Sequence, residues 1–274
     1  MSNPRFSVLE SIDQAFARVS TPEAGAALVG LVLTQALMLV GLQSQLEAQR
    51  EFIAEEELPL GADGELVPEA LPLAVDVPLG LASLLWITML VGFVAATVVA
   101  FRVLVRPEMR MPTAESSTAA PPAWNDRLGR TTFWAIVGAI VGGTLVALGL
   151  VAFVVPGLIV ATVLAFTHPY LVTERVGLLE AMKRSFDLTR GSWLRVFALL
   201  VVTALSFLTI SSLGTLAFVA LESAPAAAEL ANVGFGSLAW LFTLALLASG
   251  FDQLEAQRSV EAEKWEGIDD ELLP

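Results

Sequence analysis

Several residue types are scarce in this chain, and each shortage excludes a class of chemistry. Cysteine is absent from the 274 residues, so there is no disulfide, no thiolate nucleophile and no cysteine-ligated metal. Histidine occurs once, which leaves no pair for a zinc site and no second station for a proton relay. The sequence also lacks a glycine-rich phosphate loop. We therefore expect a protein that is not an enzyme and that uses no cofactor.

Charged residues are also scarce, at 16% of the chain, whereas 55% of the residues are apolar. A soluble domain has about 25% charged and about 45–50% apolar residues, so this composition indicates a membrane protein. The formal net charge of −13 would repel nucleic-acid phosphates, and we expect no nucleic-acid partner. Only two of the fifteen cations are lysine. This acidic, arginine-preferring composition resembles that of proteins from salt-loving prokaryotes.

Long uncharged runs predict how often the chain crosses the membrane. A helix needs about 20 residues to span the bilayer core. Five runs reach that length: 24–46, 77–101, 131–173, 196–221 and 230–251. The third is about twice too long for one span, and it contains Pro156-Gly157 near its middle, a pair that favours a turn between two helices. We therefore predict an all-α, six-helix transmembrane bundle, with spans at about 24–46, 77–105, 132–155, 157–173, 193–221 and 230–251.

The positions of the cations predict the orientation of the bundle. With a cytoplasmic N-terminus, fourteen of the fifteen Lys and Arg residues fall inside and Arg50 falls outside, as the positive-inside rule requires. A five-span alternative would place the five cations from Arg175 to Arg195 outside. We expect a protein of the cell membrane with both termini in the cytoplasm. Its parts are an amphipathic N-terminal segment (1–23), a membrane domain (24–251) and an acidic cytoplasmic tail (252–274).

Two cytoplasmic segments have the pattern of amphipathic surface helices, with apolar residues at helical spacing opposite charged ones. The residues that share this face are Phe6, Leu9, Ile12, Phe16 and Val19 in the first segment, and Leu178, Leu179, Met182, Phe186 and Thr189 in the second. The second segment also carries the cations Lys183, Arg184 and Arg190. Such a helix can lie in the membrane surface or bind a partner protein, and both interpretations stay open here.

The acidic loop 43–76 is the largest segment on the predicted outer side. Its acidic runs, 55–57 and 63–65, lack the alternating oxygen ligands and the closing glutamate of a calcium loop. We therefore expect a solvated acidic surface there rather than a metal site.

One ionisable side chain, His168, falls well inside a predicted span. An ionisable group within a membrane is a functional candidate by default. A neutral histidine can instead hydrogen-bond to a backbone carbonyl that the neighbouring Pro169 frees. Proton or ligand chemistry and a structural hydrogen bond are therefore both retained as hypotheses.

Gly138 and Gly142 form a small-xxx-small pair in the third predicted span. Such pairs let helix backbones approach closely where lipid gives no hydrophobic drive. They predict tight packing within the chain or between two copies, so a homo-oligomer stays open.

One stretch of the chain resembles a known family. Its residues, in order, are Val155-Pro156-Gly157, Phe166, Pro169, Glu174, Gly177, Glu180-Ala181, Arg184-Ser185 and Leu188-Thr189-Arg190-Gly191. This succession, within 154–200, resembles the multi-pass membrane domain associated with bacterial glycerophosphodiester phosphodiesterases and related integral membrane families of bacteria and archaea. The resemblance implies a six-helix membrane protein. The phosphodiesterase chemistry belongs to a separate soluble domain that this sequence does not contain, so no catalytic residue carries over.

Two functions are compatible with these observations. The first is a non-catalytic accessory or scaffold protein that organises an unidentified membrane-protein partner through its surface helix and tails. The alternative is a small-solute transporter or lipid-handling protein, for which His168 and the break at Pro169 are the best support. In both cases the lipid bilayer is the surrounding partner.

Overall fold

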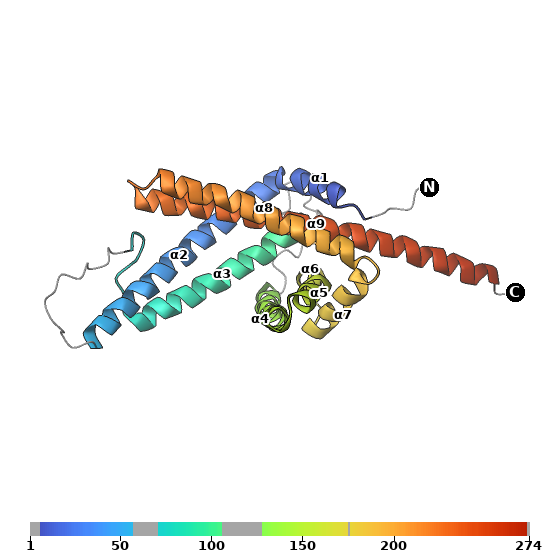
Figure 1. Ribbon diagram of the computed structural model, residues 1–274, viewed down its shortest axis with the longest axis horizontal. Helices are drawn as coiled ribbons and strands as arrows, with labels where there is room; N and C mark the ends of the chain where they lie inside the picture. Colours follow the sequence, from blue (N-terminus) through green and yellow to red (C-terminus); the bar gives the residue numbers. More distant parts are fainter. Residues whose placement is uncertain (1–5, 57–70, 106–127, 175, 273–274) are drawn as a thin grey trace, which may run out of the picture.

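The computed structural model describes residues 6–56, 71–105, 128–174 and 176–272, and every regular element in these ranges is an α-helix (Figure 1). This confirms the predicted all-α class. The helices are α1 (Val8–Val19), α2 (Pro22–Glu56), α3 (Leu79–Val105), α4 (Leu128–Ala152), α5 (Val154–Leu164), α6 (Thr167–Thr173), α7 (Leu178–Thr189), α8 (Trp193–Ala220) and α9 (Pro225–Leu272).

Six helical stretches within the described residues are long and apolar enough to cross a membrane. They are Pro22–Arg50, Leu79–Val105, Leu128–Ala152, Val154–Thr173, Trp193–Ala220 and Pro225–Val260. The fourth consists of α5 and α6 together. The chain is thus an all-α, multi-pass membrane protein, as the uncharged runs predict.

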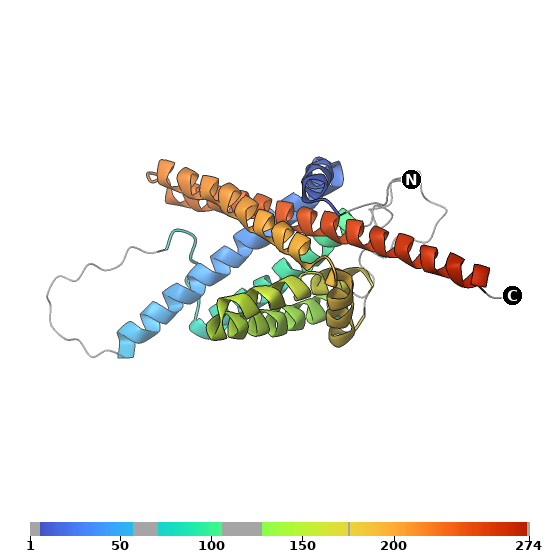
Figure 2. The same ribbon diagram turned by 45° about the vertical axis from the view of Figure 1, so that its right-hand side comes forward.

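The spans are arranged as three hairpins, α2–α3, α4–α5 and α8–α9. In Figures 1 and 2 these hairpins diverge from the region where α1, α6 and α7 lie. Helix α9 continues past that region and ends far beyond the rest of the molecule (Figure 1). We refer to the end of the bundle formed by α7 and the C-terminal part of α9 as the α7 end.

Local sequence explains where two of these helices begin and end. Thr21 accepts a hydrogen bond on its side-chain oxygen from the Ala24 N–H at 3.3 Å, and Pro22 occupies the first position of α2, as expected for a capped helix start. Helix α7 ends before Gly191, whose φ of 85° is the left-handed conformation that glycine adopts without strain.

The turn between α4 and α5 lies at Phe153, so the prediction of a turn at Pro156-Gly157 is wrong by three residues. Phe153 has an extended backbone and separates Ala152 from Val154. Pro156 falls in the first turn of α5, where a missing N–H costs nothing, so proline starts the helix instead of turning the chain. A Cβ atom on Gly157 would lie 2.5 Å from the Leu150 backbone nitrogen, so glycine here permits close contact between the two helices.

The fourth span is broken between α5 and α6, at Ala165-Phe166, one turn before Pro169. Proline cannot donate to the carbonyl four residues earlier and its ring clashes with that carbonyl, which explains why the first helix ends there. The hydroxyl of Ser185, on α7, accepts from the Phe166 N–H at 3.1 Å and donates to the Val163 carbonyl at 2.6 Å. Because lipid offers no water to exposed backbone, these two bonds make the break tolerable inside a membrane.

The core lies at the α7 end, where α3, α6 and α9 meet. Phe101 of α3, Phe251 of α9 and Phe166, which directly precedes α6, are almost completely buried there. The rings of Phe166 and Phe251 are 6.0 Å apart, and Tyr170 meets Phe251 edge to face at 5.0 Å. This core fixes α6, and therefore His168, against the longest helix of the molecule.

Candidate functional site

A cavity of about 320 Å³ surrounds His168. Residues of α3, α4, α5, α6, α7 and α9 form its walls, and most of them are apolar. Apart from His168, no ionisable residue of the described chain lines the cavity. Trp240 closes one side, where its indole N–H donates to the Thr97 hydroxyl at 3.2 Å. The cavity is therefore apolar, with a few polar atoms at defined places.

Three of those polar atoms have no hydrogen-bond partner in the described part of the chain. They are Nε2 of His168 and the hydroxyl oxygens of Thr167 and Thr243, and all three are buried. The structural hydrogen bond that the sequence suggested for His168 is thus not made by Nε2. The imidazole ring instead packs edge-on to Phe101, at 6.1 Å between ring centres. Unpaired buried polar atoms are rare and costly, and these three belong to residues that line the cavity.

The structure gives the two candidate packing glycines different surroundings. A Cβ atom on Gly138 would lie 2.9 Å from a methyl carbon of Leu171, so α4 approaches α6 closely at this position. A Cβ atom on Gly142 would meet nothing within 4 Å, and Gly142 borders the cavity. Gly138 therefore permits helix packing, whereas Gly142 keeps space open.

Helix α7 packs on the bundle through Ala181, Ser185, Leu188 and Thr189, which are buried, and leaves part of its predicted apolar face outside. Ala181 and Ser185 are completely buried, whereas Leu179 and Phe186 are 82% and 51% exposed. Leu178 and Met182, from the predicted apolar face, line the His168 cavity instead. The predicted apolar face is thus divided between the cavity and the outer surface, as suits a helix that touches both protein and membrane surface.

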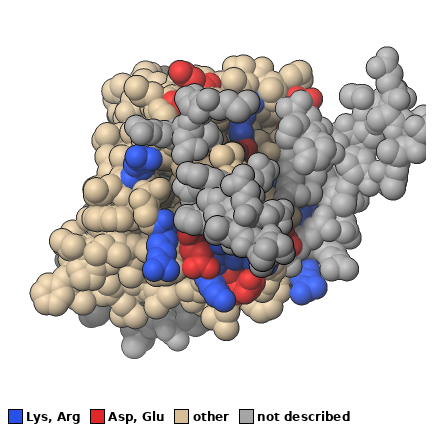
Figure 3. Space-filling view, turned by 90° about the vertical axis from the view of Figure 1, so that its right-hand side faces the viewer, with Lys and Arg blue, Asp and Glu red and all other residues tan. Residues whose placement is uncertain are grey.

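The cations of α7 differ in their contacts. Arg184 donates to Glu180 at 2.8 Å, the i,i+4 pair, and also bonds to Glu174 at the end of α6. Lys183 and Arg190 are exposed. A polar hollow of about 710 Å³ lies beside them, between α7 and α9, with Lys183 and Arg184 on one side and Glu255 and Arg258 on the other. Figure 3 shows charged side chains of both signs gathered on this face of the molecule.

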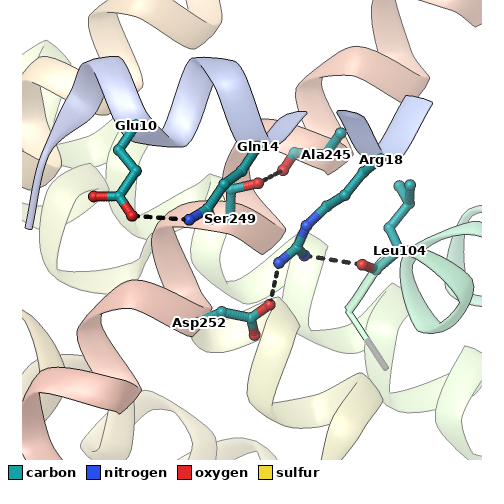
Figure 4. Close-up of polar contacts among 7 residues, drawn as sticks. All are labelled: Glu10, Gln14, Arg18, Leu104, Ala245, Ser249 and Asp252. Atoms are coloured by element: carbon teal, nitrogen blue, oxygen red, sulfur yellow. Dashed lines mark hydrogen bonds and ion pairs between the residues drawn. The ribbon is translucent and has the colours of Figure 1, made fainter. Parts of the chain in front are cut away.

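Helix α1 is clamped to α9 rather than lying free on the surface. The guanidinium of Arg18 donates to the Asp252 carboxylate at 2.5 Å and to the Leu104 carbonyl at 2.9 Å (Figure 4). These bonds join α1, α3 and α9 at one point. As in α7, small residues, Ser11 and Ala15, are buried, and large apolar ones such as Leu9 and Phe16 stay exposed.

Arg102 is a site residue that the sequence analysis counted only as a cytoplasmic cation. It lies within α3 and is fully buried. Its side chain donates to the Val172 carbonyl at 3.3 Å and to the Thr131 hydroxyl at 2.9 Å, which joins α3 to α6 and α4. The signal that could have revealed it is an arginine one turn before the end of an otherwise uncharged helix.

Among the described residues, no group of three or more His, Cys, Asp or Glu side chains could hold a metal ion. The predicted acidic run at 63–65 lies outside the described residues, as does Glu57 of the other run.

Comparison of the chain with known protein families, with curated proteins and with solved structures finds no match. The family resemblance of residues 154–200 therefore rests on the quoted residues alone.

Proposed function

We propose that this protein is a non-catalytic accessory protein of the cell membrane, which holds a partner at its cytoplasmic face. In this proposal both termini are cytoplasmic, as the cation distribution favours. The observation that carries it is the continuity of α9, a single 48-residue helix from Pro225 to Leu272, which is about twice as long as a membrane span requires.

The rod, residues 252–272, supports a role in binding at a distance from the membrane. At 1.5 Å per residue it extends about 30 Å. The ion pair between Arg18 and Asp252 lies at its base and joins it to α1. A rod that continues a membrane helix without a break presents a partner at a defined distance and angle.

The charge of the rod indicates what kind of partner fits it. Eight Asp and Glu residues lie in 252–272, against the two cations Arg258 and Lys264. An acidic helix is repelled by an anionic membrane surface, so it favours a protein with a basic face. The resemblance of residues 154–200 to a membrane domain without catalytic residues supports the same non-catalytic role.

Site-specific photo-crosslinking in membranes of the native host tests this proposal. A photo-reactive amino acid at the exposed Ser259, in the rod, is expected to give a discrete protein adduct that weakens as salt rises. The matched control is the exposed Leu208 on α8, which is expected to give lipid adducts only. Lipid adducts alone at both positions, in repeated experiments, would contradict the accessory role.

The alternative, a small-solute transporter or lipid-handling protein, is favoured by one observation, the cavity around His168. Flux of solute or lipid across liposomes that contain the purified protein tests it. Flux that depends on His168, and is lost in His168→Ala, is the expected result for this alternative. Absent flux, or flux unchanged by the substitution, would remove its main support.

A further inference from the structure

We propose that the outer side of α7 binds the phosphate of anionic phospholipid headgroups at the membrane surface. The binding surface is the α7 stripe, formed by Leu179, Lys183, Phe186 and Arg190, which are all exposed. These residues follow one another at intervals of three or four positions, so they share one side of the helix. The stripe contains no residue of the rod on α9, so the stripe and the accessory role can each fail without the other.

Helix α7 lies at the depth of the membrane spans rather than beyond them. The Ser185 hydroxyl bonds to the Val163 carbonyl and the Phe166 N–H, and both of these residues lie within the fourth span. A Cβ atom on Gly138 would lie 3.4 Å from a methyl carbon of Leu178. Gly138 lies within the third span, about 15 Å from its first residue at 1.5 Å per residue. The inner side of α7 therefore packs on residues of two spans, and its outer side faces the surface of the same bilayer.

The chain on both sides of α7 also holds it at the membrane boundary. The fourth span ends at Thr173 and the fifth begins at Trp193, so α7 connects two membrane helices. In Figure 2 it runs across the end of the α4–α5 hairpin rather than along it. Trp193 is half-exposed, and tryptophan is enriched at the membrane–water interface. An amphipathic helix in this position lies in the plane of the interface.

The stripe combines the two kinds of side chain that an anionic membrane surface attracts. Leu179 and Phe186 are exposed apolar residues that enter the boundary of the acyl region. Lys183 and Arg190 form no ion pair within the described part of the chain. Their long stems lie along apolar surface while the charged ends reach the headgroup phosphates. The apolar pair therefore sets the depth, and the cations select the headgroup.

The acidic residues of α7 do not occupy these two cations. Glu180 is exposed, but its carboxylate accepts from Arg184 at 2.8 Å. Asp187 is half-buried and lines the hollow between α7 and α9. The charge that remains on the outer side of α7 is therefore positive, as an anionic headgroup requires.

Helix α1 shows that exposed apolar residues alone do not select the headgroup. It exposes Leu9 and Phe16, as α7 exposes Leu179 and Phe186. The exposed charges of α1, however, are those of Glu10 and Asp13, which anionic headgroups repel. Of these two surface helices, α7 is therefore the one that fits an anionic lipid.

Native mass spectrometry of the full-length protein tests the headgroup preference. The protein is released from detergent micelles that contain equimolar dioleoyl phosphatidylglycerol and dioleoyl phosphatidylcholine. The double variant Lys183→Gln/Arg190→Gln is expected to lower the ratio of bound anionic to bound zwitterionic lipid at least about fivefold. The matched control Arg258→Gln/Lys264→Gln removes two cations from the rod and is expected to keep the ratio within about twofold of wild type.

Electron paramagnetic resonance of nitroxide-labelled cysteines tests the depth of the stripe, and the chain has no native cysteine to interfere. The variants are Leu179→Cys and Phe186→Cys, in nanodiscs of the same two lipids. Oxygen concentrates in lipid, so its collisions are expected to exceed those of a water-soluble nickel chelate at both positions. Ser259→Cys, exposed on the rod, is expected to show the reverse. This measurement keeps both cations, so it stays decisive if the double variant does not fold.

Three results would overturn the inference. The first is a lipid ratio that is the same in wild type and in Lys183→Gln/Arg190→Gln. The second is an equal fall of the ratio in the rod control, which means that the loss of any two cations has this effect. The third is an excess of nickel collisions at positions 179 and 186, which means that the stripe faces water and is open to an acidic protein surface instead.

Discussion

Helices α4 and α9 are both apolar enough to span a membrane, yet their surroundings differ greatly. Helix α4 is the more apolar of the two over its best 18 residues, but only 6% of that window is buried, against 44% for α9. In α4, Leu148 and Val151 are largely exposed. In α9, Ala245 and Ser249 are completely buried.

Hydropathy alone therefore does not decide which helix is buried. A lipid tail is as apolar as leucine, so an apolar side chain gains nothing by leaving lipid for protein, and small residues allow close packing instead. A Cβ atom on Gly250 of α9 would lie 2.3 Å from Leu199 of α8, and Ser237 of α9 donates to Gln35 of α2 at 2.5 Å. Small and polar positions thus contribute close contacts in α9, beside buried large residues such as Leu241, Leu246 and Phe251.

The largest effect is expected from enlarging an alanine in the packed helix. Ala245→Phe forces a large ring into a fully buried position of α9 and should lower the free energy of unfolding by about 3 kcal/mol. The same substitution at the exposed Ala147 of α4 should change it by less than about 0.5 kcal/mol. Unfolding in mixed micelles of increasing dodecyl sulfate content measures both. Equal losses at the two positions would contradict the comparison.

A smaller effect is expected where α4 does pack, against α5. Gly157→Ala places a methyl group against the Leu150 backbone and should cost about 1–2 kcal/mol. Gly143→Ala meets open space and should be neutral or should stabilise by up to about 1 kcal/mol, because alanine is the better helix former. The same unfolding experiment compares them, and a Gly157→Ala variant as stable as wild type would show that the hairpin is looser than described.

The smallest effect is expected from the clamp between α1 and α9. Arg18 and Asp252 are partly exposed, so a double-mutant cycle with Arg18→Gln and Asp252→Asn should give a coupling below about 1 kcal/mol. The coupling should weaken further in molar salt because the charges are screened. A coupling that is larger than that and insensitive to salt would mean that the pair, rather than small-residue packing, holds the helices at this end.

The sequence predicts the spans well because charge and hydropathy decide which segments lie in lipid. It also marks the two interruptions of the third uncharged run, although proline acts differently at each. Pro156 lies in the first turn of α5, whereas Pro169 lies one turn after the end of α5. The buried faces could not be predicted from apolar spacing alone, because in lipid an apolar side chain can face either the lipid or a neighbouring helix. In α7 the pattern selects Leu179 and Phe186, whereas packing selects Ala181 and Ser185.

The candidate site was only partly predictable for a related reason. His168 stands out because it lies well inside the uncharged run 131–173, but Thr167 and Thr243 are ordinary residues until the fold places them beside one cavity. Ser185 was visible only as part of a family-like motif. Its bonds across the break between α5 and α6 depend on contacts between helices that sequence spacing does not encode.

The most direct test of the account is cysteine accessibility in intact cells, which the absence of native cysteine makes straightforward. Single substitutions Ala62→Cys, Thr118→Cys and Ser259→Cys report on the segment between the first two spans, on the segment between the second and third spans, and on the C-terminal rod. The account predicts that a membrane-impermeant maleimide labels position 62 in intact cells, and labels positions 118 and 259 only after the membrane is opened. Labelling of position 118 from outside would contradict the six-span bundle with cytoplasmic termini.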